Sequence, residues 1–261
     1  MEPSYFGSSA KPLLGIYHPP EGARVRELGV LLCYSGPQEY MRCHWAFRKL
    51  AALLAREGFH AFRFDYYGTG DSGGESDEGT LAQWQDDVQQ ALQELKDVSG
   101  VRKVSVVAFR LGAVVAARAP LKVRDLVLWE PVVNGREYVR ELVSIHHRRF
   151  AHSLTPPRLP RQGPLGELLG LPFSATLQAE VEAADLLTTP LACRAERVTV
   201  VSSEDRPEHK ALAESLGKGT GAPRIESRRV EEDVVSAADD DGFLLSTRAQ
   251  REIAALLGDR P

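Results

Sequence analysis

The turn around Arg110 holds the residues that could do chemistry in this sequence. Residues 104–109 are apolar and predict a buried strand, and residues 111–118 predict the helix that follows it. The small residues Ala108 and Gly112 flank the turn and allow the chain to change direction sharply there. Arg110 at its centre stays protonated and cannot attack a carbonyl, but it can bind a carboxylate or a phosphate bidentately. The sequence therefore predicts an anion-binding guanidinium where a strand meets a helix.

Three carboxylates are candidates to meet Arg110 at the same edge of the sheet. Glu39, Glu130 and Asp205 each come at or shortly after the end of an apolar segment. A cation at a helix N-terminus opposes the helix dipole, so Arg110 needs an anionic partner. Two interpretations stay open: a structural ion pair with one of these carboxylates, or a contact with the carboxylate or phosphate of a ligand.

Apolar segments alternate with amphipathic helical patterns along much of the chain. The expected strands are 5–7, 13–17, 29–34, 59–67, 104–109, 125–130, 198–203 and 224–230, and the expected helices are 44–56, 80–98, 111–118, 135–150, 174–187, 208–216 and 247–257. This alternation favours an α/β fold with a mostly parallel central sheet flanked by helices on both faces.

The alternation breaks between residues 133 and 196. No strand-like run is found there, and a loop rich in proline and glycine, residues 155–170, separates two helical stretches. Such a segment is too long for an ordinary connection. We therefore expect an α/β core made of residues 1–132 and 197–261, with residues 133–196 inserted as a helical cap, or lid, over the carboxyl edge of the sheet.

Composition predicts an ordinary soluble globular protein. The 261 residues carry a formal net charge of −4 without a long basic run, which argues against a nucleic-acid surface. No apolar run reaches membrane-spanning length, and the N-terminus lacks a signal-peptide pattern. Cys33, Cys43 and Cys193 match no zinc or redox motif, which favours the cytoplasm. We expect no cofactor and no metal, and a homo-oligomer stays open.

Four stretches give the chain a resemblance to a known superfamily. They are YFGSS (5–9), GPQEYMR (36–42), FDYYGTGDSGG (64–74) and FRLGA (109–113), and residues 128–132 support them. With these stretches the chain resembles the α/β-hydrolases, and most of all the serine aminopeptidase-like and exosortase-associated hydrolases. The resemblance covers nearly the whole chain and implies the α/β-hydrolase fold.

The resemblance also implies a catalytic triad that this sequence does not complete. The nucleophile turn should read G-x-S-x-G, but residues 108–112 read AFRLG, so Arg110 stands at the serine position. The triad acid matches Asp205, or Glu130 as in some members of the superfamily. The histidine should fall in the loop 236–243, which contains none and whose three aspartates read as solvated loop.

Ligand contacts are expected around the oxyanion position. The backbone N–H of Leu111, together with Ser35, Gly36 and Glu39, would bind an anion or a polarised carbonyl. Trp129 is expected either to line a pocket under the cap or to pack in the core.

Four functions follow from this site. The first is a degenerate α/β-hydrolase, a pseudoenzyme that binds a small acyl, thioester or peptide-derived metabolite in a biosynthetic pathway without hydrolysing it. The second is a non-hydrolytic epimerase, cyclase or lyase in which Arg110 stabilises an enolate or carboxylate and Asp205, Glu130 or Glu39 moves a proton. The third is an active hydrolase or thioesterase with a rebuilt site, such as Ser35 with His209. The fourth is a structural partner protein.

Overall fold

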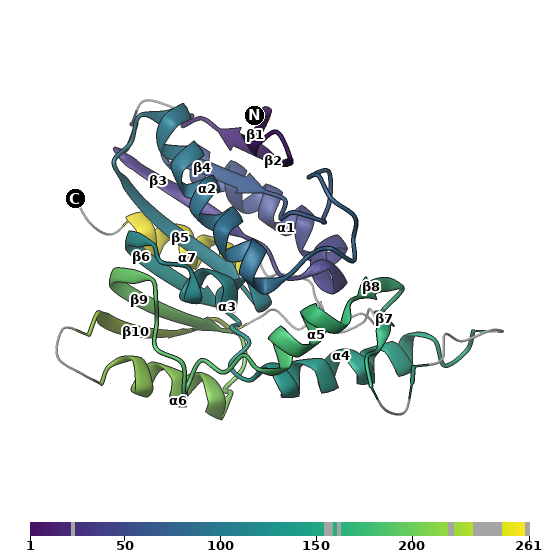
Figure 1. The fold of residues 1–261 in the computed structure, drawn as a ribbon. Helices are drawn as coiled ribbons and strands as arrows, with labels where there is room; N and C mark the ends of the chain where they lie inside the picture. Colours follow the sequence, from purple (N-terminus) through teal and green to yellow (C-terminus); the bar gives the residue numbers. More distant parts are fainter. Residues whose placement is uncertain (22–23, 154–158, 161–162, 219–221, 232–246, 259–261) are drawn as a thin grey trace.

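A computed structural model of the chain describes residues 1–21, 24–153, 159–160, 163–218, 222–231 and 247–258. An eight-stranded sheet runs through the middle of the molecule, in the order β1-β2-β4-β3-β5-β6-β9-β10 (Figure 1). Its strands are β1 (Glu2–Ser8), β2 (Lys11–His18), β3 (Leu28–Cys33), β4 (His60–Phe64), β5 (Lys103–Phe109), β6 (Lys122–Trp129), β9 (Arg194–Ser202) and β10 (Arg224–Arg229).

The sheet is parallel from β4 to β10 and antiparallel at one edge. β2 pairs antiparallel with both β1 and β4, while the remaining neighbours pair in parallel. Every residue of β3 is buried, as expected for a parallel strand covered on both faces. The mostly parallel α/β fold predicted from the sequence is confirmed.

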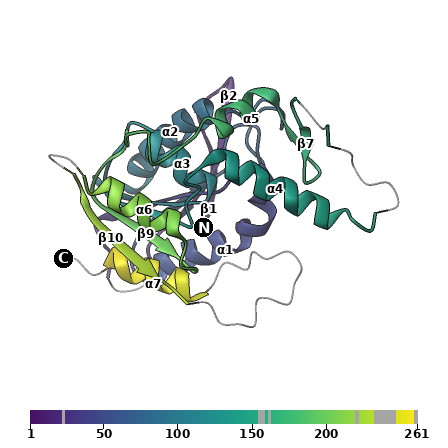
Figure 2. The same cartoon turned by 90° about the horizontal axis from the view of Figure 1, so that it is seen from below.

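Helices cover both faces of the sheet. They are α1 (Pro37–Arg56), α2 (Leu81–Ser99), α3 (Leu111–Arg118), α4 (Gly135–Arg149), α5 (Ala175–Glu182), α6 (Pro207–Leu216) and α7 (Thr247–Gly258). α1 and α7 lie on one face, and α2, α3 and α6 lie on the other (Figures 1 and 2). Thr80 caps α2 by accepting a hydrogen bond from the Gln83 N–H at 3.1 Å, so this boundary was correctly predicted.

The first helix begins earlier than the sequence pattern indicated. The prediction placed its start at residue 44, whereas α1 starts at Pro37 with Gly36 as its N-cap. Proline at the first helical position has its φ already set for a helix and loses no hydrogen bond there. The Gly-Pro pair therefore starts the helix instead of forming a loop, and Glu39 lies in the first turn of α1 rather than in a loop.

The segment between β6 and β9 contains a hairpin that was not expected. β7 (Gly166–Leu168) and β8 (Leu171–Phe173) pair antiparallel around a turn in which Leu169 and Gly170 have positive φ. Strands of three residues are too short to produce a periodic pattern, so the prediction that this segment holds no strand was wrong. α5 ends at Glu182, five residues earlier than predicted. The division into a core and a cap stays a prediction.

Candidate functional site

Arg110 occupies the turn between β5 and α3 in a conformation that side chains rarely adopt. Its φ is 50° and its ψ is −117°. Such backbone strain costs about 1–3 kcal/mol and persists only where the surroundings enforce it. Here the Arg110 N–H donates to the Trp129 carbonyl at 3.1 Å, and the Arg110 carbonyl accepts from the Val132 N–H at 3.2 Å. A Cβ on Gly112 would lie 1.9 Å from the Tyr34 carbonyl oxygen, so only glycine fits at that position of the turn.

The Arg110 guanidinium is buried between two glutamates. Its Nε donates to Glu39 Oε1 at 3.1 Å, and its Nη2 donates to Glu141 Oε2 at 2.8 Å. The ring of Tyr138 packs against it, with 5.2 Å between Arg110 Cζ and the ring centroid. Burial alone would lower the pKa of Arg110, but the charges of Glu39 and Glu141 raise it overall. The anionic partner that the sequence required is therefore present, and one of the three candidates, Glu39, supplies it.

Glu39 also joins Arg110 to two hydroxyl groups. Its Oε2 accepts hydrogen bonds from Tyr138 Oη, at 2.7 Å, and from Ser35 Oγ. Tyr138 is buried, and its pKa is raised first by that burial and then by the charge of Glu39. The Ser35 hydroxyl is thus held by a carboxylate and is not paired with His209, as the rebuilt hydrolase site would have required.

Glu141 was missed in the sequence, whereas Tyr138 was expected either to line a pocket under the cap or to pack in the core. Tyr138 and Glu141 lie three residues apart on α4, so they share one face of that helix. That spacing was readable from the sequence. What it could not indicate is that this face of α4 packs over the turn at Arg110.

The other expected site residues are engaged elsewhere. Glu130 has a φ of 45°, and its Oε1 accepts a hydrogen bond from the backbone N–H of Ser203. Asp205 is exposed and pairs with Lys210 at 2.7 Å, and this contact lowers the pKa of Asp205. Trp129 is buried in an aromatic cluster in the core rather than lining a pocket under the cap. The side chains of these three residues therefore have other partners, although the Trp129 carbonyl accepts from the Arg110 N–H.

The Leu111 side chain lies close to Gly36 at the expected oxyanion position. Leu111 is buried at the start of α3, and its Cδ2 lies 3.0 Å from where a Cβ on Gly36 would stand. The two backbone segments that were expected to supply oxyanion donors therefore lie against each other. Their role as donors stays a prediction.

A second polar pair lies at the same end of the sheet, at the end of β9. Ser202 Oγ lies 2.6 Å from His209 Nδ1, and His209 Nε2 lies 3.0 Å from the Pro131 carbonyl oxygen. A carbonyl only accepts, so Nε2 carries the proton and Nδ1 accepts from the Ser202 hydroxyl. Burial comes first among the causes that lower the pKa of His209. The sequence held no signal for this pair, because a serine inside a strand and a histidine inside a helix are ordinary.

Two hollows open beside these groups. The first, the α4–α6 cleft, has a volume of about 350 Å³ and lies between the first turns of α4 and α6, beside Arg110 and Glu141. The second, the Ser202 hollow, has a volume of about 280 Å³ and is lined by Ser202, His209 and residues of β10. In the part of the chain that the structure describes, no cluster of His, Cys, Asp or Glu could hold a metal ion. The loop 236–243 lies outside the described residues.

Comparison with known proteins identifies the family. A family model described as serine aminopeptidase, S33, matches residues 29–191. The chain belongs to this family. No curated protein matches this serine aminopeptidase-family chain, and its resemblance to exosortase-associated hydrolases stays a prediction. None of the helices that the structure describes has the length and apolar character needed to cross a bilayer.

Solved structures agree with this family in fold. A putative hydrolase from Agrobacterium vitis is 18% identical, with a TM-score of 0.60, over 98% of this chain and 97% of that one. The ferulic acid complex of Est1E from Butyrivibrio proteoclasticus is 12% identical, with a TM-score of 0.63, over 98% and 96%. Alpha/beta hydrolase domain-containing protein 10 from mouse is 18% identical, with a TM-score of 0.57, over 99% and 98%. The α/β-hydrolase fold of this serine aminopeptidase-family chain is therefore established.

Proposed function

We propose that this chain does not hydrolyse substrates at its Arg110 turn and instead binds a small acyl or peptide-derived carboxylate in the α4–α6 cleft. The observation that carries the proposal is the state of Arg110. It stands at the position where the family resemblance expects a serine nucleophile, and it is buried and paired with two glutamates. A guanidinium cannot act as a nucleophile, so the ordinary acyl-enzyme cannot form at this position.

The two glutamates hold Arg110 in different ways. Glu39 is buried and has two further hydrogen bonds, whereas the Glu141 side chain is 35% exposed and lines the cleft. A ligand carboxylate entering the cleft would replace Glu141 at Arg110 Nη2 and leave the bond to Glu39 intact. Arg110 would then bind the carboxylate of the ligand, as arginine does in many binding sites.

The remaining walls of the cleft favour a small ligand that carries more than a carboxylate. Residues 131–133 supply apolar surface, while Glu137 and Glu208 supply negative charge beside Arg206. Carboxylates attract an amine, so a peptide-derived ligand with both charges fits the cleft. Its volume, about 350 Å³, is at the lower end of the range for small-molecule sites. We propose that residues 133–196 form a cap, and that α4 in this cap supplies Glu137 and Glu141 to the cleft.

The replacement of Glu141 gives the test. Glu141→Gln removes the competing carboxylate, so the proposal expects tighter binding of small amino acids and dipeptides, by about tenfold, in calorimetric titration. The matched control is Glu214→Gln, because Glu214 is exposed on α6 and lies outside the cleft. Equal affinities in both variants, or no binding of any carboxylate, would refute the proposal.

A second candidate function rests on the pair Ser202 and His209. The Nδ1 of His209 is placed to take the Ser202 proton as the hydroxyl attacks an acyl carbon, while the Pro131 carbonyl holds the other side of the ring. His209 has a lowered pKa and is therefore a neutral base at pH 7. This arrangement would make the chain an active hydrolase with a rebuilt site.

Labelling with a fluorophosphonate separates the two functions. Under the second candidate, the probe modifies the wild-type protein at Ser202 and not the Ser202→Ala variant. Ser227→Ala is the control, because Ser227 lines the same hollow without the histidine contact. Absence of labelling, with no turnover of p-nitrophenyl esters, would exclude hydrolysis at Ser202 and leave the binding function.

A further inference from the structure

The opposite edge of the sheet carries a larger hollow. It has a volume of about 690 Å³ and is lined by residues 24–28, His60, residues 99–103 and Arg124. These residues lie at or near the amino ends of the parallel strands. Lys103 begins β5, whereas Arg110 follows its other end. A strand of seven residues spans about 20 Å, so this amino-edge hollow is separate from the site around Arg110.

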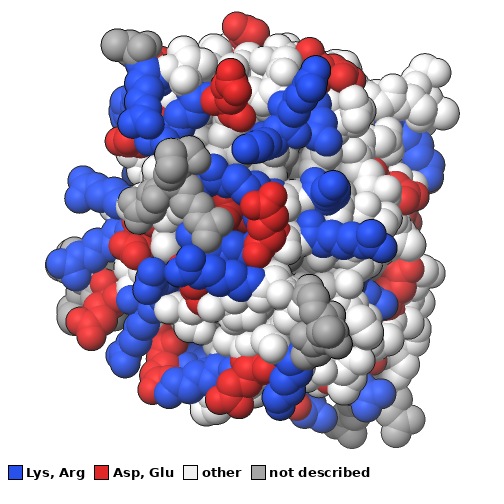
Figure 3. Space-filling model, turned by 90° about the vertical axis from the view of Figure 1, so that its left-hand side faces the viewer, with Lys and Arg blue, Asp and Glu red and all other residues white. Residues whose placement is uncertain are grey.

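The amino-edge hollow is strongly positive. Five of the residues that line it are basic and one, Glu27, is acidic, although the whole chain has a net charge of −4. Figure 3 shows the face where the parallel strands begin, and Lys and Arg side chains gather over its middle. The concentration of one sign of charge in a concave surface raises the local concentration of anions.

Hydrogen bonds to backbone carbonyls and to a carboxylate hold two of the arginines in place. Arg26 Nε donates to the Glu57 carbonyl at 2.9 Å, and its Nη1 lies 3.3 Å from the Gly258 carbonyl oxygen at the end of α7. Arg124 Nε donates to Asp125 Oδ2 at 2.7 Å, and its Nη2 donates to the Leu257 carbonyl of α7 at 2.7 Å. A guanidinium has five N–H donors, so these bonds leave others for a ligand. Arginines fixed in this way lose little entropy when they bind an anion.

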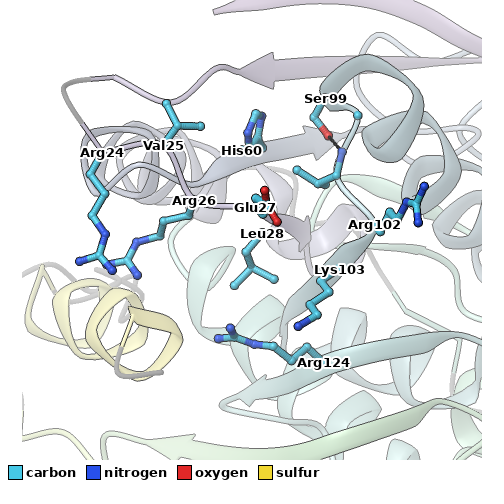
Figure 4. A pocket seen from close by; sticks show the side chains of 12 residues that line it. Arg24, Val25, Arg26, Glu27, Leu28, His60, Ser99, Arg102, Lys103 and Arg124 are labelled. Carbon is cyan, nitrogen blue, oxygen red and sulfur yellow. Dashed lines mark hydrogen bonds between the residues drawn. The ribbon is translucent and has the colours of Figure 1, made fainter. Parts of the chain in front are cut away.

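Lys103 and Arg24 complete the positive surface of the amino-edge hollow. In Figure 4 the side chains of Lys103 and Arg124 extend toward the same side of the hollow, and Arg24 lies near Arg26 beside α7. Arg102 points away from it. Lys103 is exposed, and within the ranges that the structure describes it forms no ion pair. Its ammonium group is therefore available to an anion in the hollow.

We propose that the amino-edge hollow binds a small polyanion with two linked phosphate groups. Fixed guanidinium groups match phosphate oxygens bidentately, and the lysine supplies a further point charge. Arg24, Arg26, Lys103 and Arg124 bring four positive charges, and Glu27 and the Asp125 paired with Arg124 bring two negative ones. A diphosphate offsets the remaining positive charge, whereas a single carboxylate offsets only part of it. The hollow is within the size range of small-molecule sites and has room for a group attached to the diphosphate.

Calorimetric titration of the full chain with inorganic pyrophosphate tests this site. We expect binding at least about tenfold tighter than that of inorganic sulfate. Lys103→Glu should weaken pyrophosphate binding by about tenfold or more, because it reverses one of the contacting charges. Lys49→Glu is the matched control: Lys49 is exposed on α1, outside the hollow, and its reversal changes the net charge equally.

The outcomes distinguish a specific binding site from a nonspecific electrostatic attraction of anions. Loss of affinity in Lys103→Glu but not in Lys49→Glu supports the proposal. Equal losses in both variants, or equal binding of sulfate and pyrophosphate, would show an adventitious ion only. Absence of heat at millimolar pyrophosphate would also overturn the proposal, and the arginines at the end of α7 would then act only as caps of that helix.

Discussion

Replacement of Arg110 by methionine probes the buried network at the turn where we propose that the family's nucleophile is replaced. The variant leaves Glu39 buried without its counter-charge, and removal of one partner of a buried ion pair typically costs about 3–5 kcal/mol. Two hydrogen bonds to Glu39, from Tyr138 and Ser35, remain, so the lower end of that range applies. The bond to Glu141 contributes less than about 1 kcal/mol, because Glu141 is partly exposed. The expected loss of unfolding free energy is therefore about 3 kcal/mol.

Urea unfolding followed by tryptophan fluorescence measures this loss. At pH 7 Arg110→Met should unfold at lower urea than the wild type, with the same dependence on urea. The double variant Arg110→Met with Glu39→Gln should recover most of the stability, since it carries no unpaired charge.

A control on α4 isolates burial as the cause. Arg140 and Glu137 form an exposed pair on the same helix, so Arg140→Met should cost less than about 1 kcal/mol. If Arg110→Met costs no more than Arg140→Met at pH 7, the guanidinium is not a buried, paired group. The argument for a closed nucleophile position would then fail.

Three further substitutions test the fold that holds these sites. Asp125→Asn should cost about 3 kcal/mol or more in urea unfolding, because Asp125 is fully buried and accepts from Arg197 at 2.8 Å; a loss below about 1 kcal/mol would contradict this. Burial raises the pKa of Asp87 to about 6. The folded state thus holds that proton more tightly than the unfolded chain. The proton on Asp87 therefore contributes up to about 3 kcal/mol to the free energy of unfolding below about pH 4, and this contribution is lost by about pH 6. Asp87→Asn should flatten this pH dependence. Gly112→Ala should prevent folding, as measured by circular dichroism, because its Cβ would meet the Tyr34 carbonyl; a native spectrum would disprove the close approach.

The sequence determined the fold because its signals are local. Continuous apolar runs separated by amphipathic helical patterns can be buried on both faces of a parallel sheet and in few other ways. The helix boundary at Thr80 followed from the capping preference of one side chain. The need of Arg110 for an anion followed from its own charge, and Glu39 was among the candidates that the sequence offered.

Only the tertiary structure decided which groups meet. Glu141 and Tyr138 reach Arg110 from α4, about 30 residues along the chain, because that helix packs over the turn. Ser202 at the end of β9 contacts His209 of α6 because that helix packs against the end of the strand. Such partners depend on the packing of whole elements, and packing is a property of the complete core rather than of any segment that can be read alone.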